Sequence, residues 1–113
     1  MTNTTRRAVL GLVPGFLAAP ALIRAAHAGG HLRLPVNIQG NAFNPNTIEI
    51  GQGDYVVFTN ADGAPHTATA RDGFFDSGNL NRGDSFEVRM TQTGTFDFFC
   101  RIHPGMTGTI TVT

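Results

Sequence analysis

The sequence predicts an all-β fold, an antiparallel sandwich or barrel built from short strands. From Gly29 onward, apolar residues recur at every second position, which is typical of half-buried strands. Turn-forming residues interrupt these stretches at intervals of roughly 8–12 residues, a spacing typical of sandwiches and barrels. No segment carries a sustained helical period. The chain of 113 residues is therefore expected to hold a single β domain.

Three alternating stretches are the expected strands of the first half of this domain. The first, residues 32–38, contains Pro35, which donates no ladder hydrogen bond and therefore favours an edge position. The second, residues 48–50, has an isoleucine at each end. After the turn residues 51–54, the third stretch, residues 55–59, is mostly apolar on both faces, so we expect it to lie in the centre of a sheet.

The second half is expected to begin with a turn, residues 60–65, that places His66 at the head of a short strand, residues 66–70. Periodicity does not assign the region that follows, in which Phe74 and Phe75 are expected to anchor the chain to the core. Alternation then predicts further strands over residues 86–90, 95–100 and 107–112.

Residues 1–28 are interpreted as a cleaved export signal. The arginine pair at residues 6–7 precedes an apolar run over residues 8–23, and an Ala-x-Ala pattern ends the segment at residues 26–28. The arginine pair favours the twin-arginine route, and hence a location in the periplasm. A transmembrane helix is the alternative interpretation, but the run is short for a span of about 20 residues and contains two prolines.

The predicted domain, residues 29–113, carries little positive charge. All eight basic residues of the chain are arginines, and three of them precede residue 29, whereas all eight carboxylates follow it. This balance argues against a nucleic-acid partner and, once the signal is removed, against an anionic membrane, because both attract clusters of basic residues.

A thiol, an imidazole and a thioether stand within seven residues, at Cys100, His103 and Met106. These groups are soft or borderline metal ligands, and His66 offers a second imidazole from a loop upstream. Two histidines and a cysteine in one plane, with a weak axial methionine, form the ligand set of a blue-copper site. A lone cysteine cannot form an internal disulfide, so its presence in an exported protein needs another reason. Metal ligation supplies that reason.

Each of these residues also has an ordinary interpretation. Taken singly, the two histidines would be loop residues, Met106 would pack in the core, and Cys100 would be a buried free thiol that behaves as a small hydrophobe. The combination of all four, in this order and spacing, is what indicates a metal site.

With these residues in view, the domain resembles the cupredoxin family over nearly its whole length. The matching segments are residues 48–50, residues 53–60, the pair Pro65-His66, residues 95–100 and the Cys-x-x-His-x-x-Met loop. This short loop is similar to that of amicyanin, more than to that of plastocyanin or azurin. Many relatives have Asn directly after the first histidine, whereas this chain has Thr67, whose hydroxyl offers fewer hydrogen-bonding groups than an amide.

The resemblance implies a Greek-key sandwich or barrel with one type 1 copper, held by His66, Cys100, His103 and Met106. It also implies a monomeric electron carrier, not an enzyme, in which copper cycles between Cu(II) and Cu(I). By family analogy the first histidine is shielded, and the ring edge of the second reaches the surface where redox partner proteins dock. Small or apolar residues would form that docking patch: Ala64, Pro65, Pro104 and Gly105.

Three alternatives belong to other functional classes. A carrier that delivers or buffers copper would use similar ligands but would exchange the ion readily. An enzyme with Cys100 as nucleophile and His103 as base is a second alternative, although no orienting or oxyanion-stabilising group is visible beside them. A purely structural sandwich would bind no metal.

Cleavage after Ala28 would create one further candidate site. The new N-terminus, Gly29-Gly30-His31, would offer an α-amine, two amides and an imidazole, a planar set of four nitrogens that suits Cu(II). This segment is therefore a hypothetical second copper site.

Overall fold

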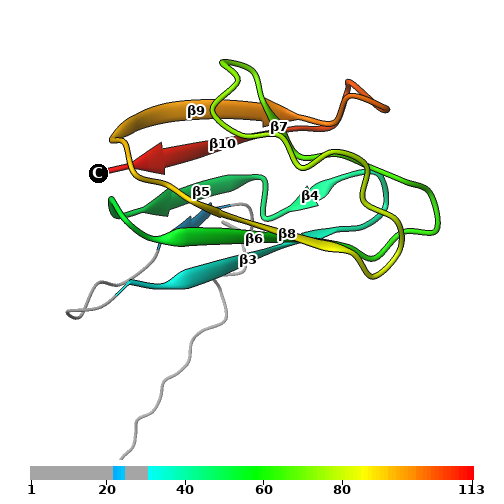
Figure 1. Ribbon diagram of the computed structural model, residues 1–113, viewed down its shortest axis with the longest axis horizontal. Coiled ribbons are helices and arrows are strands. Elements are labelled where there is room, and N and C mark those ends of the chain that lie inside the picture. Colours follow the sequence, from blue (N-terminus) through cyan, green and yellow to red (C-terminus); the bar gives the residue numbers. More distant parts are fainter. Residues whose placement is uncertain (1–21, 25–30) are drawn as a thin grey trace, which may run out of the picture.

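The computed structural model describes residues 22–24 and 31–113, and within these ranges the chain is built entirely from strands, turns and loops (Figure 1). This confirms the all-β prediction. The strands are β2 (Leu22–Arg24), β3 (Arg33–Ile38), β4 (Phe43–Asn44), β5 (Thr47–Ile50), β6 (Tyr55–Asn60), β7 (Thr69–Ala70), β8 (Ser85–Arg89), β9 (Gly94–Phe99) and β10 (Thr107–Val112).

The strands form two sheets that pack face to face as a sandwich (Figure 1). One sheet has the order β2-β5-β10-β9-β7 and the other has the order β4-β3-β6-β8. Both sheets are mixed, because β10 runs parallel to β5, and β3 runs parallel to β6. The chain enters the opposite sheet between the members of each parallel pair, and such crossovers, unlike hairpins, bring strands together in the same direction.

The core lies between the sheets and is rich in phenylalanine. On β6, Val56 and Phe58 are fully buried and alternate with half-buried residues. The ring of Phe98 from the opposite sheet packs edge-on against those of Phe58 and Phe43, with centroid distances of 5.4 Å and 4.8 Å. Both are favourable geometries for aromatic pairs. Phe75 is also buried, which confirms the expected anchoring of its segment to the core.

A glycine in β10 allows this packing. A Cβ built on Gly108 would lie 2.3 Å from Cζ of Phe98 and 2.8 Å from the carbonyl oxygen of Asn46. No side chain fits at these distances, so the absence of a Cβ lets the Phe98 ring lie across β10.

Two of the strand predictions depend on position within a sheet. The central position of residues 55–59 is confirmed, whereas the edge position expected for residues 32–38 is wrong for the strand as a whole, because β3 lies between β4 and β6. Residues 55–59 belong to β6, which lies between β3 and β8. Pro35 pairs with Val57 of β6, and the two-residue strand β4 contacts β3 only at Asn37 and Ile38. Among the described residues, Pro35 therefore has a strand partner on one side only, as its missing N–H requires.

The predicted strand over residues 66–70 is wrong in extent, because only Thr69–Ala70 form a strand. His66 makes an isolated bridge with Leu80. The N–H of Thr67 points to the Cys100 sulfur, and that of Ala68 donates to the hydroxyl of Ser77. The backbone N–H groups of these two residues thus donate to side chains and not to the carbonyls of a neighbouring strand.

Most of the predicted export signal, residues 1–28, lies outside the described residues. Its described part, Leu22–Arg24, forms β2 and pairs in parallel with β5. In the described ranges, no helix is long and apolar enough to span a membrane. The signal, its cleavage and the domain boundary at residue 29 stay predictions.

Of the hypothetical N-terminal copper site, only the histidine is described. The ring of His31 lies over Gly53, where an added Cβ would be 2.5 Å from Cε1, and its Nδ1 is 3.8 Å from a carboxylate oxygen of Asp54. Gly29 and Gly30 lie outside the described residues, so this second site stays a prediction.

Candidate metal centre

The four predicted ligands come from two loops. His66 follows the turn that leaves β6, whereas Cys100, His103 and Met106 occupy the connection between β9 and β10 (Figure 1). Two backbone hydrogen bonds close this connection: Cys100 N–H to the Met106 carbonyl at 3.1 Å, and Met106 N–H to the His103 carbonyl at 2.9 Å. Because β9 and β10 are adjacent in one sheet, both ends of the ligand loop are fixed.

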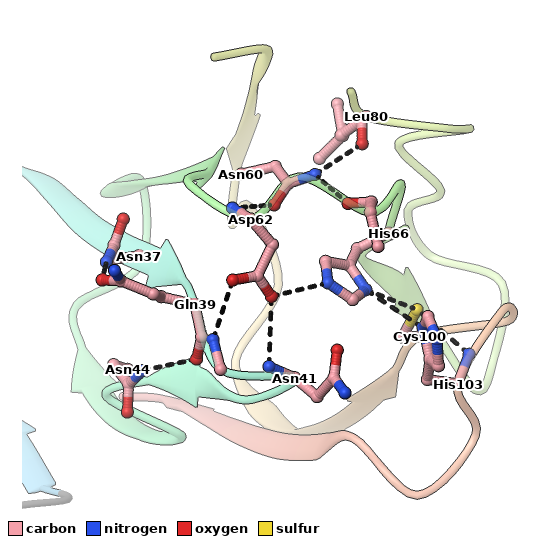
Figure 2. Close-up of polar contacts among 12 residues, drawn as sticks. Asn37, Gln39, Asn41, Asn44, Asn60, Asp62, His66, Leu80, Cys100 and His103 are labelled. Atoms are coloured by element: carbon pink, nitrogen blue, oxygen red, sulfur yellow. Dashed lines mark hydrogen bonds and ion pairs between the residues drawn. The ribbon is translucent and has the colours of Figure 1, made fainter. Parts of the chain in front are cut away.

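The structure brings three of the predicted ligand atoms together. One ligand atom from each of His66, Cys100 and His103 lies within 4.8 Å of the other two. The Nδ1 atom of His66 is 3.2 Å from Nδ1 of His103 and 3.7 Å from the Cys100 sulfur, so the two Nδ1 atoms face each other and that of His66 also faces the sulfur (Figure 2). Met106 is also buried, at the end of the same loop.

The site is shielded on the His66 side and open on the other. His66 and Cys100 are fully buried, whereas His103 is half-buried. This agrees with the shielded and surface-reaching histidines that the family resemblance implies. Ile102, beside His103, is 40% exposed and is the large apolar side chain most open to solvent in the described chain.

Backbone N–H groups surround the Cys100 sulfur. The N–H groups of Thr67 and His103 both donate to Sγ at 3.4 Å. Burial raises the pKa of this thiol. These hydrogen bonds and one from His66 lower the pKa by more than burial raises it, so that it is about 7 against an ordinary value of 9.0. A substantial fraction of the thiol is therefore ionised near neutral pH, and the thiolate is the form that binds metals.

The hydroxyl of Thr67 joins the two ligand loops. It accepts a hydrogen bond from the Arg101 N–H at 2.9 Å and lies 3.0 Å from the hydroxyl of Thr69, which in turn donates to Asp76. The residue that stands in place of the more usual asparagine thus makes the link between the loops through its hydroxyl.

Asp62 is a functional candidate that the sequence analysis did not identify. Its Oδ2 lies 2.9 Å from Nε2 of His66, and its two oxygens accept the N–H groups of Gly40 and Asn41 (Figure 2). The two backbone hydrogen bonds, followed by the one from His66, lower the pKa of Asp62 to about 2. A carboxylate four residues before a loop histidine is a visible signal, but its partners at positions 40 and 41 are not apparent from local sequence.

Asn60 shapes the turn that carries both Asp62 and His66. Its side-chain oxygen accepts the N–H of Asp62, and its amide nitrogen donates to the carbonyls of Ala64 and Leu80 (Figure 2). Because Asn60 is fully buried and ends β6, these bonds fix the turn relative to the sheet.

Comparison with known proteins finds the cupredoxin family, which the sequence resembles, along nearly the whole chain. The family model described as "Cupredoxin-like domain" matches residues 12–112. The chloroplastic plastocyanin of Oryza sativa subsp. indica is 32% identical over 123 residues, which cover 94% of this chain and 80% of the relative.

Solved structures extend this likeness to the fold. A Cu-containing nitrite reductase from Thermus scotoductus superposes with a TM-score of 0.72 at 26% identity over 82% of this chain, which spans only 28% of the reductase chain. An amicyanin variant in the Cu(I) form has a TM-score of 0.68 over 72% of this chain and 82% of its own, and at 21% identity it shows the shared fold alone.

Proposed function

This chain belongs to the cupredoxin family, and on that premise we propose that it is a type 1 blue copper protein that carries single electrons between redox partners. The observation that carries the proposal is the clustering of two imidazoles and one cysteine sulfur, with one ligand atom of each within 4.8 Å of the others, where two loops meet. This donor set suits both copper oxidation states, because nitrogen ligands favour Cu(II) and sulfur favours Cu(I).

His66, Cys100 and His103 would form the ligand plane, with Met106 as the weak axial ligand. Bound copper would supply the one-electron redox chemistry. The protein's part is to hold the ligands in one arrangement for both oxidation states, and the hydrogen bonds to the Cys100 sulfur and between the two loops support this. Burial of His66 and Cys100 keeps water from the sulfur.

The exposed side of the site supports a docking role. His103 is the ligand most open to solvent, and Ala64, Pro65, Pro104 and Gly105 are all exposed. Ile102 adds a large apolar side chain that the sequence analysis did not include. We propose that a monomer exchanges electrons here with partner proteins, across an apolar surface that sheds its water readily on contact.

We further propose that the protein works in the periplasm. The arginine pair, the apolar run and the Ala-x-Ala ending of residues 1–28 support export by the twin-arginine route. A fractionation experiment on cells that express the full chain tests this: the protein should appear in the periplasm, shortened to begin at Gly29, and replacement of both arginines by lysine should keep it inside the cell.

The colour of the purified full chain with added Cu(II) tests the electron-carrier proposal. An intense blue that a reductant bleaches and an oxidant restores is the expected result, and Cys100→Ser and His66→Ala should both be colourless. A colourless unaltered protein, or a blue Cys100→Ser variant, would contradict the proposed site. Rapid loss of copper to a mild chelator would instead favour the alternative, a copper-delivery protein.

A further inference from the structure

The structure assigns Asp62 a role beyond the four ligands: we infer that it is a positioning residue that fixes the tautomer and orientation of His66, so that Nδ1 of that ring faces the copper. This inference rests on the proposed copper site. It concerns the support behind the ligand, and nothing in the ligand motif itself implies it.

The first step is the hydrogen bond between Asp62 and His66. A carboxylate has no proton to donate, so the 2.9 Å contact requires a proton on Nε2 of His66. A neutral imidazole carries only one N–H, so Nδ1 must then present its lone pair. That lone pair points to the Cys100 sulfur at 3.7 Å and to Nδ1 of His103 at 3.2 Å, which is the arrangement a metal ligand needs.

The second step is the anchoring of the carboxylate itself. Gly40 N–H donates to Oδ1 at 2.9 Å and Asn41 N–H donates to Oδ2 at 3.1 Å. Gly40 and Asn41 have φ values of 66° and 55°, a left-handed turn whose consecutive N–H groups form a concave anion-binding surface. Asp62 is thus held between the turn that joins β3 to β4 and the ring of His66 (Figure 2).

The third step is the environment of this contact. The His66 side chain is fully buried and that of Asp62 is only 18% exposed, so solvent screens the pair weakly. The carboxylate of Asp62 also accepts the N–H groups of Gly40 and Asn41, so it cannot turn away from the His66 ring without losing these two hydrogen bonds. Loss of a carboxylate behind a metal-binding histidine typically costs 10–100-fold in metal affinity.

The charge of Asp62 also gives a direction to the reduction potential. A carboxylate on Nε2 makes the imidazole a stronger electron donor, which stabilises Cu(II) more than Cu(I). Removal of that charge should therefore raise the potential. A purely structural role, in which Asp62 only closes the turn at residues 40–41, predicts lower stability but no such shift.

Two measurements on the full chain test the inference. Long-range ¹H–¹⁵N NMR of the metal-free protein should show His66 protonated at Nε2. In Asp62→Asn, the side-chain NH₂ can turn to the ring and donate to Nε2, so the Nδ1–H tautomer should appear. Competition with a chelator should show Cu(II) binding weakened 10–100-fold in Asp62→Asn and Asp62→Ala, with a raised potential.

Asp84→Asn is the matched control, because Oδ2 of Asp84 also accepts a turn N–H, that of Asn81 at 2.9 Å. It should keep the affinity and potential of the unaltered chain. An Nδ1–H tautomer in the unaltered metal-free protein would overturn the inference whether or not any variant folds, as would unchanged affinity and potential in Asp62→Asn. If the unaltered chain binds no copper, the proposed function fails, while the tautomer measurement still decides the role of Asp62.

Discussion

The Thr67 hydroxyl accepts the backbone N–H of Arg101 at 2.9 Å, and this contact helps to join the loop of the first histidine to the loop of the other three proposed ligands. The same hydroxyl can donate onward, because Thr69 uses its own proton on Asp76 and leaves an oxygen lone pair toward Thr67. An alcohol, which is both donor and acceptor, therefore serves here where an amide is more usual.

Replacement of Thr67 by valine should lower the free energy of unfolding of the metal-free protein by about 1–3 kcal/mol, because it leaves the partly buried N–H of Arg101 without its acceptor. Urea denaturation measures this change. Thr59→Val is the control, since among the described residues the Thr59 hydroxyl bonds the exposed hydroxyl of Ser85, and the effect of this change should stay within about 0.5 kcal/mol. Equal losses in both variants would show that the link between the loops adds no stability.

Replacement of Met106 by leucine should leave the protein blue but raise its reduction potential. The axial thioether is a weak ligand, and its loss destabilises Cu(II) more than Cu(I). Because Met106 is 5% exposed, leucine of similar volume should also keep the loop dry and packed. Cyclic voltammetry measures the potential, and Met90→Leu, which alters a fully buried methionine of the core, should leave it unchanged. A lowered potential in Met106→Leu would argue against axial ligation.

The Cys100 thiol of the metal-free protein should ionise with a midpoint near pH 7, as followed by thiolate absorbance at 240 nm. Its pKa in the folded chain is below the ordinary value of 9.0, so the folded state binds fewer protons than the unfolded state between these values. The resulting stability is fully present above about pH 9 and is lost as the pH falls through 7. Cys100→Ser should lack this part of the pH dependence, and a midpoint at 9 would contradict the prediction.

Replacement of Gly108 by alanine should destabilise the domain by about 1–3 kcal/mol, because the new Cβ would overlap the Phe98 ring and the Asn46 carbonyl. Gly105→Ala is the matched control in the ligand loop, where an added Cβ meets no atom within 4 Å. Thermal unfolding of the metal-free variants compares them. If both unfold at the same temperature, the ring of Phe98 has room to move aside.

Replacement of Ile102 by aspartate should slow electron self-exchange between the oxidised and reduced protein, without moving the reduction potential. A charge in the proposed docking patch costs desolvation, and it repels the same charge on the other copy when two copies meet there. NMR line broadening in mixtures of the two forms measures the rate. Thr95→Asp adds the same charge at the other end of β9. If this variant slows self-exchange to a similar extent, either the two copies meet at another surface or the slowing comes from net charge alone.

Local alternation predicted the strands well where they pair with other strands. The strand β10 occupies residues 107–112 as predicted, since Ile110 and Val112 alternate with threonines and are buried against the opposite sheet. The ligand loop was predictable for a different reason: its three chemical groups lie close together in the sequence. The pairing partners were not predictable, because the parallel contacts of β3 with β6 and β5 with β10 depend on crossovers between the sheets.

The features that sequence reasoning missed depend on partners far along the chain. Thr67 is held by Cys100 and Arg101, more than thirty residues away, and for this reason the strand expected over residues 66–70 was too long. Asp62 is held by backbone N–H groups 21 and 22 residues earlier, in a turn that has no distinctive side chain for this purpose. Backbone donors have the same chemistry in every residue except proline, so their role emerges only from the fold.

The position of β10 has a consequence for biosynthesis. This strand comes after all the other described strands, yet it lies between β5 and β9 and carries the pairings that join the first half of its sheet to the second. A chain whose residues 107–112 have not yet emerged from the ribosome therefore cannot complete this sheet or the loop that ends at Met106. Contacts between such distant segments also form slowly. We expect a nascent chain that stops before residue 107 to remain open to proteases, and copper acquisition to follow the pairing of β10 with β5 and β9.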